Sequence, residues 1–121
     1  MTVRSHVLIV EDNDLVAGAL RILLERETQL VSTAASVAET LAVGPPLGVP
    51  LVLLDLTLPD GDGLTLVEPL HAAGWEKIVA LTGHDDEETR QRCLDAGCID
   101  VLLKPVPARD LVEKSAAWLA S

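Results

Sequence analysis

Short apolar runs alternate along the chain with longer segments in which apolar residues recur every three or four positions. Runs of this length are typical of β-strands, and the longer segments are typical of amphipathic helices. Their regular alternation predicts an α/β fold built from βαβ units on a parallel sheet. The five predicted strands are residues 7–10, 30–33, 51–54, 78–81 and 101–103.

Four of these runs are almost wholly apolar, as expected of parallel strands that helices cover on both faces. The second run contains Ser32 and Thr33, so we expect it at an edge of the sheet. Between the first two runs, apolar residues at helical spacing predict a helix with one buried stripe. The residues of that stripe are Leu15, Val16, Ala19, Leu20, Leu23 and Leu24.

Two shorter helices are predicted in the middle of the chain. One covers residues 36–42 and ends before the loop that Gly44 begins. The other lies around residues 64–70, and Pro69 inside it removes a backbone donor. We therefore expect a kink or early fraying in that helix.

A fourth helix is predicted over residues 85–96, because acidic residues stand at its start and Gly97 follows its end. It has few apolar residues, so we expect it to be the least firmly docked helix. A last helix begins near Pro107. The expected anchors of the fourth helix are Cys93, Leu94 and Ala96, and those of the last are Leu111, Val112, Ser115, Trp118 and Leu119.

Length and composition restrict the possible functions. The 121 residues suit one domain, and 49% hydrophobic with 23% charged residues is ordinary for a soluble globular protein. Aromatic residues make up only 2%, with no Phe and no Tyr, so Leu, Val, Ile and Ala must pack the core. The net charge of −10 repels nucleic-acid phosphates and anionic lipids, and stacking on bases lacks aromatic rings. We expect proteins, cations or small molecules as partners, and neither direct nucleic-acid binding nor a membrane.

The sequence contains neither a signal-peptide pattern nor an apolar run long enough to span a bilayer, which favours a cytoplasmic location. Cys93 and Cys98 lack the spacing of a zinc site and are expected to be reduced packing residues. His6, His71 and His84 are scattered, and we expect them at the surface.

Polar residues follow four of the five predicted strands, at the points where those strands end. In open parallel sheets the carboxyl ends of the strands meet at one edge, where ligands bind. These residues are Glu11, Asp12, Asn13 and Asp14 after the first strand, Asp55 after the third, Thr82 and Gly83 after the fourth, and Lys104 and Pro105 after the fifth.

Three carboxylates gathered at that edge, from Glu11, Asp12 and Asp55, would repel one another unless a cation lay among them. Oxygen ligands with few protein contacts suit a hard cation such as Mg²⁺. Lys104 supplies a second positive charge, and Thr82 supplies a hydroxyl donor. Together these groups suit a phosphoryl group carried on an aspartate, because metal, ammonium and hydroxyl can each neutralise one of its oxygens.

Taken singly, several of these residues have structural explanations. Asp12 or Asn13 is a natural N-cap for the first helix, while Asp60 and Asp62 fit an ordinary turn and N-cap, for which we expect no chemistry. Asp55 is the hardest to explain in this way. A carboxylate directly after an apolar strand is costly to bury without a cation or hydrogen-bond donors nearby.

In this order and spacing, four motifs resemble the response-regulator receiver family of two-component signalling systems, from one end of the chain to the other. The motifs are Val7-Leu-Ile-Val-Glu-Asp12, Leu53-Leu-Asp-Leu-Thr-Leu-Pro-Asp-Gly-Asp-Gly63, Ala80-Leu-Thr82 and Leu102-Leu-Lys-Pro105. The resemblance implies one flavodoxin-like, doubly wound (βα)5 domain over residues 1–121. Its parallel sheet would have the order 2-1-3-4-5, with two helices on one face and three on the other.

The resemblance also implies a phosphorylation site. Asp55 would accept a phosphoryl group from a sensor histidine kinase or a histidine phosphotransfer protein, and water would later hydrolyse the acyl phosphate. Glu11, Asp12, Asp55 and the backbone carbonyl of Thr57 would hold Mg²⁺ or Mn²⁺. Such a protein catalyses its own phosphorylation and dephosphorylation, without turnover of a separate substrate.

On the same resemblance, Thr82 and Lys104 would contact the phosphoryl group, and the bond between Lys104 and Pro105 would be cis. Because the sequence ends at Ser121, we expect output through contacts with a downstream protein rather than through an attached DNA-binding domain. The chain would be a stand-alone regulator or a piece of a larger regulator or hybrid kinase.

The chain departs from the family three residues before the lysine. Receivers usually carry Tyr or Phe there, and the ring turns inward on phosphorylation, but this chain has Val101. Output would then depend on movement of Thr82 and of the helix over residues 85–96. Thr57 and His84 occupy positions that influence the lifetime of the acyl phosphate in the family.

Two alternatives remain open from the sequence. Asp55-Leu-Thr57 also resembles the nucleophile loop of haloacid-dehalogenase-like phosphatases, although that fold usually needs a longer chain and places its nucleophile after the first strand. The second alternative is a degenerate receiver that binds partners without being phosphorylated. It would require loss of the acidic cluster or of Lys104, and both are present.

Overall fold

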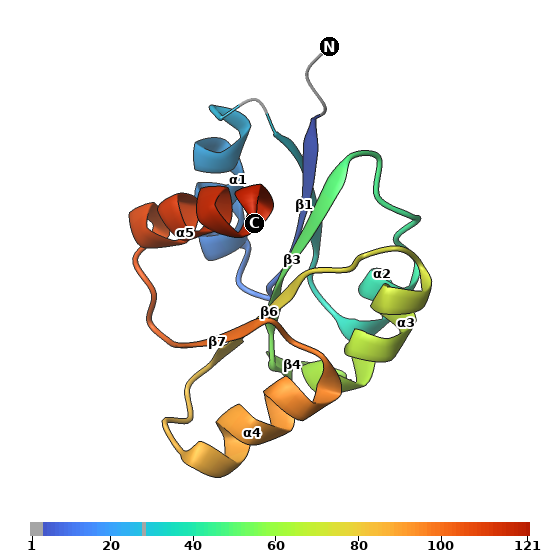
Figure 1. Ribbon diagram of the computed structural model, residues 1–121, viewed down its shortest axis with the longest axis vertical. Coiled ribbons are helices and arrows are strands. Elements are labelled where there is room, and N and C mark those ends of the chain that lie inside the picture. The colour runs from blue at the N-terminus through green and yellow to red at the C-terminus, as the bar shows by residue number, and fades with distance from the viewer. Residues whose placement is uncertain (1–3, 28) are drawn as a thin grey trace.

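A computed structural model describes residues 4–27 and 29–121 of the chain. Its main feature is a five-stranded parallel sheet with the order β2-β1-β3-β6-β7 (Figure 1). The predicted sheet and its order are therefore confirmed, with the mixed second strand at one edge and the last strand at the other. The strands are β1 (Ser5–Val10), β2 (Leu30–Ala34), β3 (Val49–Asp55), β6 (Ile78–Thr82) and β7 (Asp100–Leu103).

Helices cover both faces of this sheet. In Figure 1, α1 and α5 lie on one side of the strands, whereas α2, α3 and α4 lie on the other. A short antiparallel hairpin of β4 (Thr57–Leu58) and β5 (Gly61–Asp62) follows β3, and the sequence did not predict it. The helices are α1 (Asp14–Glu25), α2 (Val37–Leu41), the 3₁₀ helix η1 (Gly63–Leu66), α3 (Val67–Ala72), α4 (Glu87–Ala96) and α5 (Ala108–Ala120).

The central strands are buried on both faces, so alternate residues enter two separate apolar layers. Leu111 of α5 belongs to the layer under α1 and α5, and Trp75 belongs to the layer under α2, α3 and α4. Trp75 is fully buried, so an aromatic ring joins the Leu, Val, Ile and Ala residues that were expected to pack the core. The buried strand residues of the α1 and α5 layer are Val7, Ile9, Val31, Leu51, Leu53, Val79 and Leu81.

The predicted buried stripe of α1 is partly wrong. Ala17, Leu20 and Leu24 are the buried residues of α1, whereas Leu15 is 85% exposed and Val16 and Ala19 are also exposed. The sheet and α5 cover only one side of a helix that is apolar over a wider arc. Of these exposed residues, Leu15 and Val16 lie in the first turn of α1, beside the carboxyl edge of the sheet.

The remaining helices follow the sequence with small differences. Ser36 and Asp86 are the N-caps of α2 and α4, and Gly97 ends α4 in the left-handed conformation, with φ of 114°. The irregularity expected around Pro69 is a change from 3₁₀ to α-helix, which puts Pro69 in the first turn of α3. Of the three expected anchors of α4, Cys93 is buried, but Leu94 and Ala96 are exposed.

The prediction for His6 is wrong, although His71 and His84 are exposed as expected. His6 is buried and packs edge-to-face against Trp75, with 4.8 Å between ring centroids. Its Nδ1 accepts a hydrogen bond from the backbone N–H of Leu47 at 2.9 Å. The predicted strand began at Val7, so the sequence pattern gave no sign that His6 belongs to β1 and is buried.

Both cysteines are free and buried, as expected, and burial raises the pKa of Cys98 to about 12. Within residues 4–27 and 29–121, no helix is long and apolar enough to cross a membrane.

Candidate functional site

The register of the sheet brings the predicted site residues to one edge. Val10 of β1 pairs with Leu54 of β3, so the next residues, Glu11 and Asp55, lie level with each other. Asp55 in turn pairs with Leu81 of β6. Three neighbouring parallel strands thus end at the same height, as the sequence predicted.

The same register continues across the last two strands. Thr82 ends β6 and pairs with Leu103, the last residue of β7, so Lys104 follows directly beyond Thr82. The backbone N–H of Lys104 donates to the carbonyl of Thr82 at 2.7 Å. The peptide bond between Lys104 and Pro105 is cis, as the family resemblance implied.

Asp55 is almost completely buried, with 2% of its surface exposed, yet both carboxylate oxygens have donors. Lys104 Nζ lies 3.0 Å from Oδ2, and the backbone N–H of Thr57 donates to Oδ1 at 3.0 Å. Burial by itself would raise the pKa of Asp55, but interactions with Glu11, with the N–H of Thr57 and with Lys104 lower it overall. Asp55 is therefore held as a carboxylate inside the protein.

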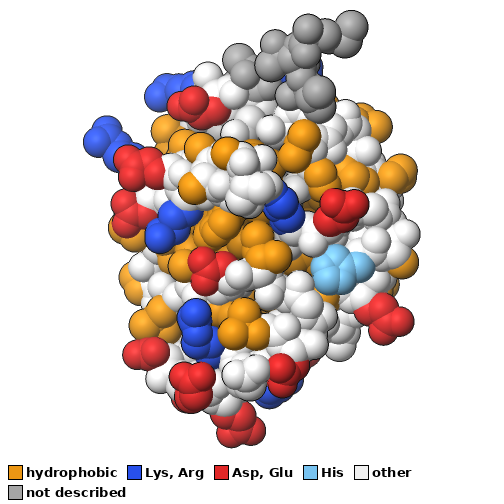
Figure 2. Space-filling view, viewed as in Figure 1, with side chains coloured by type: hydrophobic (Ala, Val, Ile, Leu, Met, Phe, Trp, Pro, Cys, Tyr) orange, Lys and Arg blue, Asp and Glu red, His pale blue; other side chains and the backbone are white. Residues whose placement is uncertain are grey.

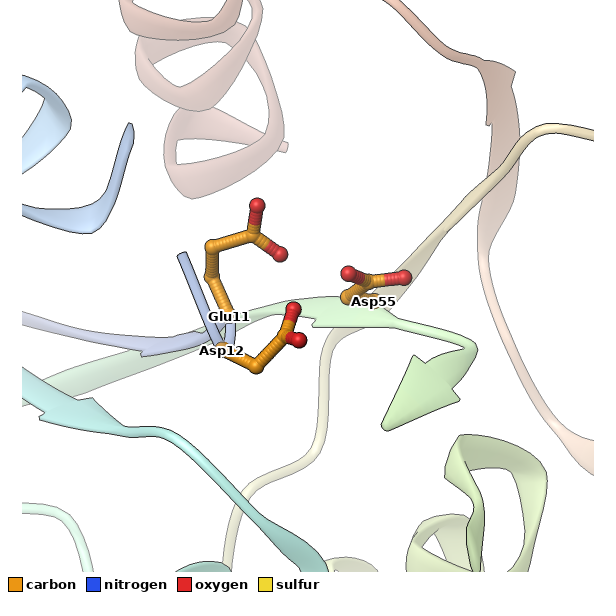
Figure 3. A group of neighbouring side chains, drawn as sticks. All are labelled: Glu11, Asp12 and Asp55. Carbon is orange, nitrogen blue, oxygen red and sulfur yellow. The ribbon is translucent and has the colours of Figure 1, made fainter. Parts of the chain in front are cut away.

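Glu11, Asp12 and Asp55 form an acidic cluster in which one carboxylate oxygen of each lies within 4.8 Å of the others. Figure 3 shows the three carboxylates around a common space at the ends of β1 and β3. This spacing suits oxygen ligands around one divalent cation. The structure thus brings together the three side chains that the sequence predicted as metal ligands.

The charges in this cluster are not balanced by the protein alone. Lys104 Nζ is 3.8 Å from Glu11 Oε2, which is buried and has no hydrogen-bond partner among the described residues. Burial raises the pKa of Glu11 to about 7, and the negative charge of Asp55 contributes in the same direction. A buried carboxylate oxygen without a partner is costly, so the donor set fits a cation.

The choice between Asp12 and Asn13 as the helix cap is settled. Asn13 is the N-cap of α1, and its Oδ1 accepts hydrogen bonds from the N–H groups of Leu15 at 3.0 Å and Val16 at 3.2 Å. Because Asn13 satisfies the first turn of the helix, the side chain of Asp12 is left to face the acidic cluster.

Thr82 is buried at the rim of the site, and its Oγ1 accepts a hydrogen bond from the N–H of His84 at 3.1 Å. Thr57 is exposed on β4, and together with Thr82 it lines a hollow of about 200 Å³ that reaches α4. His84 also lines this hollow. The two positions that the family links to phosphoryl lifetime therefore lie beside the same space.

The turn after Asp55 makes a contact with α2 that the sequence did not predict. Asp62 is the N-cap of η1, as expected, but both carboxylate oxygens of Asp60 accept hydrogen bonds from backbone N–H groups of α2. The donors are Val37 at 2.7 Å and Ala38 at 3.0 Å. No local signal predicts this contact, because the partners are more than twenty residues apart in sequence.

Gly63 shows why this turn must follow closely after Asp55. Its N–H donates to the carbonyl of Leu56 at 2.9 Å, and a Cβ at this position would collide with the backbone carbonyl of Asp55. The glycine lets the turn pass directly over the end of β3.

Residues 7–116 match the family described as response regulator receiver domain, and the chain belongs to this family. It is therefore a receiver domain of the kind found in two-component signalling systems. The chain is 30% identical over 118 residues to the transcriptional regulatory protein ResD of Bacillus subtilis, covering 98% of this chain and 49% of the relative. It is 35% identical over 122 residues to the transcriptional regulatory protein AruR of Pseudomonas aeruginosa, covering 95% and 49%. The chain thus spans about half the length of these relatives.

Solved structures agree with this assignment. A CheY-like response regulator receiver domain protein from Methanospirillum hungatei JF-1 superposes with a TM-score of 0.85 at 33% identity, covering 97% of this chain and 94% of that one. The non-phosphorylated HemR receiver domain from Leptospira biflexa gives a TM-score of 0.87 at 25% identity, with 98% and 96% covered. The family match leaves no support for the phosphatase alternative.

Proposed function

We propose that this chain accepts a phosphoryl group on Asp55 in a reaction that depends on Mg²⁺ or Mn²⁺, and that residues 1–121 act as a single receiver domain. The observation that carries the proposal is the position of Asp55. Its carboxylate is buried at the end of β3, 3.0 Å from an ammonium group and beside two further carboxylates. Structural burial alone does not account for three acidic groups around one lysine.

In the proposed reaction, a carboxylate oxygen of Asp55 forms a bond to phosphorus as the bond between phosphorus and nitrogen of a phosphohistidine breaks. Glu11, Asp12, Asp55 and the carbonyl of Thr57 would hold the metal ion, which offsets negative charge on the phosphoryl oxygens. The unpartnered Oε2 of Glu11 supports this ligand set.

Lys104 and Thr82 have separate roles in the proposal. Lys104 pairs with Asp55 before the reaction and moves its hydrogen bonds to a phosphoryl oxygen as charge develops there. Thr82 offers its hydroxyl hydrogen to a second oxygen, because its Oγ1 accepts from His84 and leaves the hydroxyl proton free to donate.

We propose a sensor histidine kinase or a histidine phosphotransfer protein as the phosphodonor. The exposed residue Val16 lines a groove of about 290 Å³ together with Glu11 and Lys104, and the exposed Leu15 lines a second hollow of about 330 Å³ that also contacts Val16. An apolar rim beside the phosphoacceptor suits a partner that docks a helix there. The two free, buried cysteines are consistent with a reducing compartment, and we propose the cytoplasm.

Output would occur through a downstream protein. The face of the molecule in Figure 2 has apolar side chains at its centre, over β7 between α4 and α5, with charged side chains around them. Exposed apolar residues around β7 include Leu94, Ile99 and Leu103. Such a surface suits a protein partner better than nucleic acid, which the net charge of −10 would repel.

The test is the intact mass of the protein after incubation with acetyl phosphate and Mg²⁺. We expect one phosphate adduct on the wild type, none on Asp55→Asn, and one on Asp60→Asn, a matched control in the following turn. An adduct that survives in Asp55→Asn would contradict the assignment of the phosphoacceptor. No adduct on the wild type would support the degenerate receiver, which binds partners without phosphorylation.

A further inference from the structure

Helix α4 is held to the rest of the protein by few contacts. Among its ten residues, all of them within the described chain, Cys93 alone is buried. Leu94, which follows it, is 37% exposed. Figure 1 shows α4 at one end of the molecule, with its C-terminal end close to α3 and its N-terminal end projecting away from the other helices. Polar contacts must therefore contribute much of what fixes the position of this helix.

Two arginines on α4 make such contacts, and both reach segments that adjoin the site. Arg90 Nη1 donates to the carbonyl of Val101 in β7 at 3.3 Å. Arg92 Nη2 lies 3.4 Å from Asp62 Oδ2, in the turn that follows Asp55. The other oxygen of Asp62 accepts a hydrogen bond from Leu64 at 3.0 Å, so the carboxylate is fixed while the arginine is free to leave.

The ion pair of Arg92 and Asp62 is weak because both side chains are largely exposed to solvent. The two side chains are 58% and 49% exposed, and exposed pairs of this kind change an equilibrium by about two- to fivefold. Arg92 and Asp62 both line the hollow of about 200 Å³ that also contacts Thr57 and Thr82. The guanidinium thus borders a space that Thr82 also borders, and Thr82 directly follows Leu81, the strand partner of Asp55.

We propose that Arg92 is a positioning residue that couples α4 to the state of Asp55: it pairs with Asp62 before phosphorylation and is drawn into the hollow by the phosphoryl group afterwards. This inference rests on the proposed phosphorylation of Asp55. A phosphoryl group carries close to two negative charges, whereas Asp62 carries one, so it competes well for a half-exposed guanidinium. Movement of Arg92 carries α4 with it, since one buried cysteine offers little resistance.

Such coupling gives this chain a route to output that needs no aromatic ring at position 101. The carbonyl of Val101 accepts a hydrogen bond from Arg90, so a shift of α4 would also reach β7. A shift of α4 also changes the apolar surface over β7, which lies beside it in Figure 2.

The test measures amide exchange in residues 87–96 before and after phosphorylation by acetyl phosphate and Mg²⁺, with intact mass recorded on the same samples. In the wild type we expect exchange in α4 to change by about two- to fivefold on phosphorylation. Arg92→Gln should still form the adduct but lose that change, and Arg92→Lys should largely restore it because it keeps the charge. Arg109→Gln, an exposed arginine on α5, should behave as the wild type.

A second variant tests the competition directly. Asp62→Asn removes the partner that holds Arg92 away from the hollow, so exchange in α4 should shift toward the phosphorylated value without any phosphoryl group. High salt should diminish both effects by screening the charges. An adduct on Arg92→Gln with the full wild-type change in α4 would overturn the role of Arg92. Absence of an adduct from the wild type as well would instead overturn the proposed function, and this inference with it.

Discussion

His6 lies at the end of the sheet opposite Asp55 and uses both ring nitrogens. Because the N–H of Leu47 donates to Nδ1, the proton of the neutral imidazole is on Nε2, 2.8 Å from the hydroxyl oxygen of Ser32. The imidazole therefore joins β1, β2 and the loop before β3. Burial lowers the pKa of His6, since a charged ring would lose solvation inside the protein.

The lowered pKa predicts how stability changes with pH. Below about pH 6.5 the unfolded chain binds a proton at His6 that the folded protein does not, so the free energy of unfolding falls as the pH falls. The slope contributed by His6 is at most about 1.4 kcal/mol per pH unit, between its unfolded and folded pKa values. Urea unfolding at a series of pH values, for the wild type and His6→Gln, measures this contribution as the difference between the two slopes.

The difference between the two slopes is needed because Glu11 changes the free energy of unfolding with pH in the direction opposite to His6. Its pKa is raised to about 7, so the folded protein binds a proton there that the unfolded chain releases, and stability falls as the pH rises. This contribution is common to both proteins and cancels. Equal slopes for His6→Gln and the wild type would show that His6 does not titrate differently on folding.

Among the elements, α1 uses some of its apolar residues to pack on the sheet and exposes others beside the site, and its sequence does not distinguish the two sets. Its N-terminal turn is fixed by Asn13, its buried side holds the helix on the sheet, and its exposed apolar residues lie beside the site. Hydrophobic spacing alone could not distinguish residues that pack in a core from residues at an apolar rim. The prediction of the helix was therefore confirmed while the assignment of Leu15 and Val16 to the buried stripe was wrong.

Replacing the N-cap should destabilise the protein without removing the acidic cluster. Asn13→Ala leaves the N–H groups of Leu15 and Val16 without their acceptor, and we expect a loss of about 1 kcal/mol in the free energy of unfolding. Asn13→Ser keeps a capping oxygen and should lose much less. Chemical denaturation of the three proteins measures the effect, and equal midpoints for Asn13→Ala and Asn13→Ser would contradict the role of the cap.

At the scale of the whole molecule, the sequence predicted what depends on local pattern and strand order. Buried parallel strands are recognisable as apolar runs, and the polar residues at their ends meet because the strands share one register. Contacts between distant segments were not predictable in this way. The cap that Asp60 gives to α2 and the burial of His6 against Trp75 depend on tertiary placement, and no motif marks either of them.

The net charge of −10 makes the whole molecule sensitive to cations, and the acidic cluster should add a specific part to that response. Any ion that binds the folded state alone raises its stability, by about 2.7 kcal/mol at one hundred times the dissociation constant. We expect Mg²⁺ to raise the melting temperature above the value in NaCl of equal ionic strength. Asp12→Asn should lose this excess, and Asp14→Asn, an exposed neighbour on α1, should retain it. An unchanged excess in Asp12→Asn would exclude the acidic cluster as the metal site.

The near absence of aromatic residues has a practical consequence. With no Tyr and two Trp in the chain, its ultraviolet emission comes from Trp75 and Trp118 alone. Trp75 is fully buried against the His6 ring, and its Nε1 donates to the carbonyl of Gly44 at 3.1 Å. Its fluorescence is therefore an intrinsic optical probe for the His6 end of the sheet, on the side of the molecule away from Asp55.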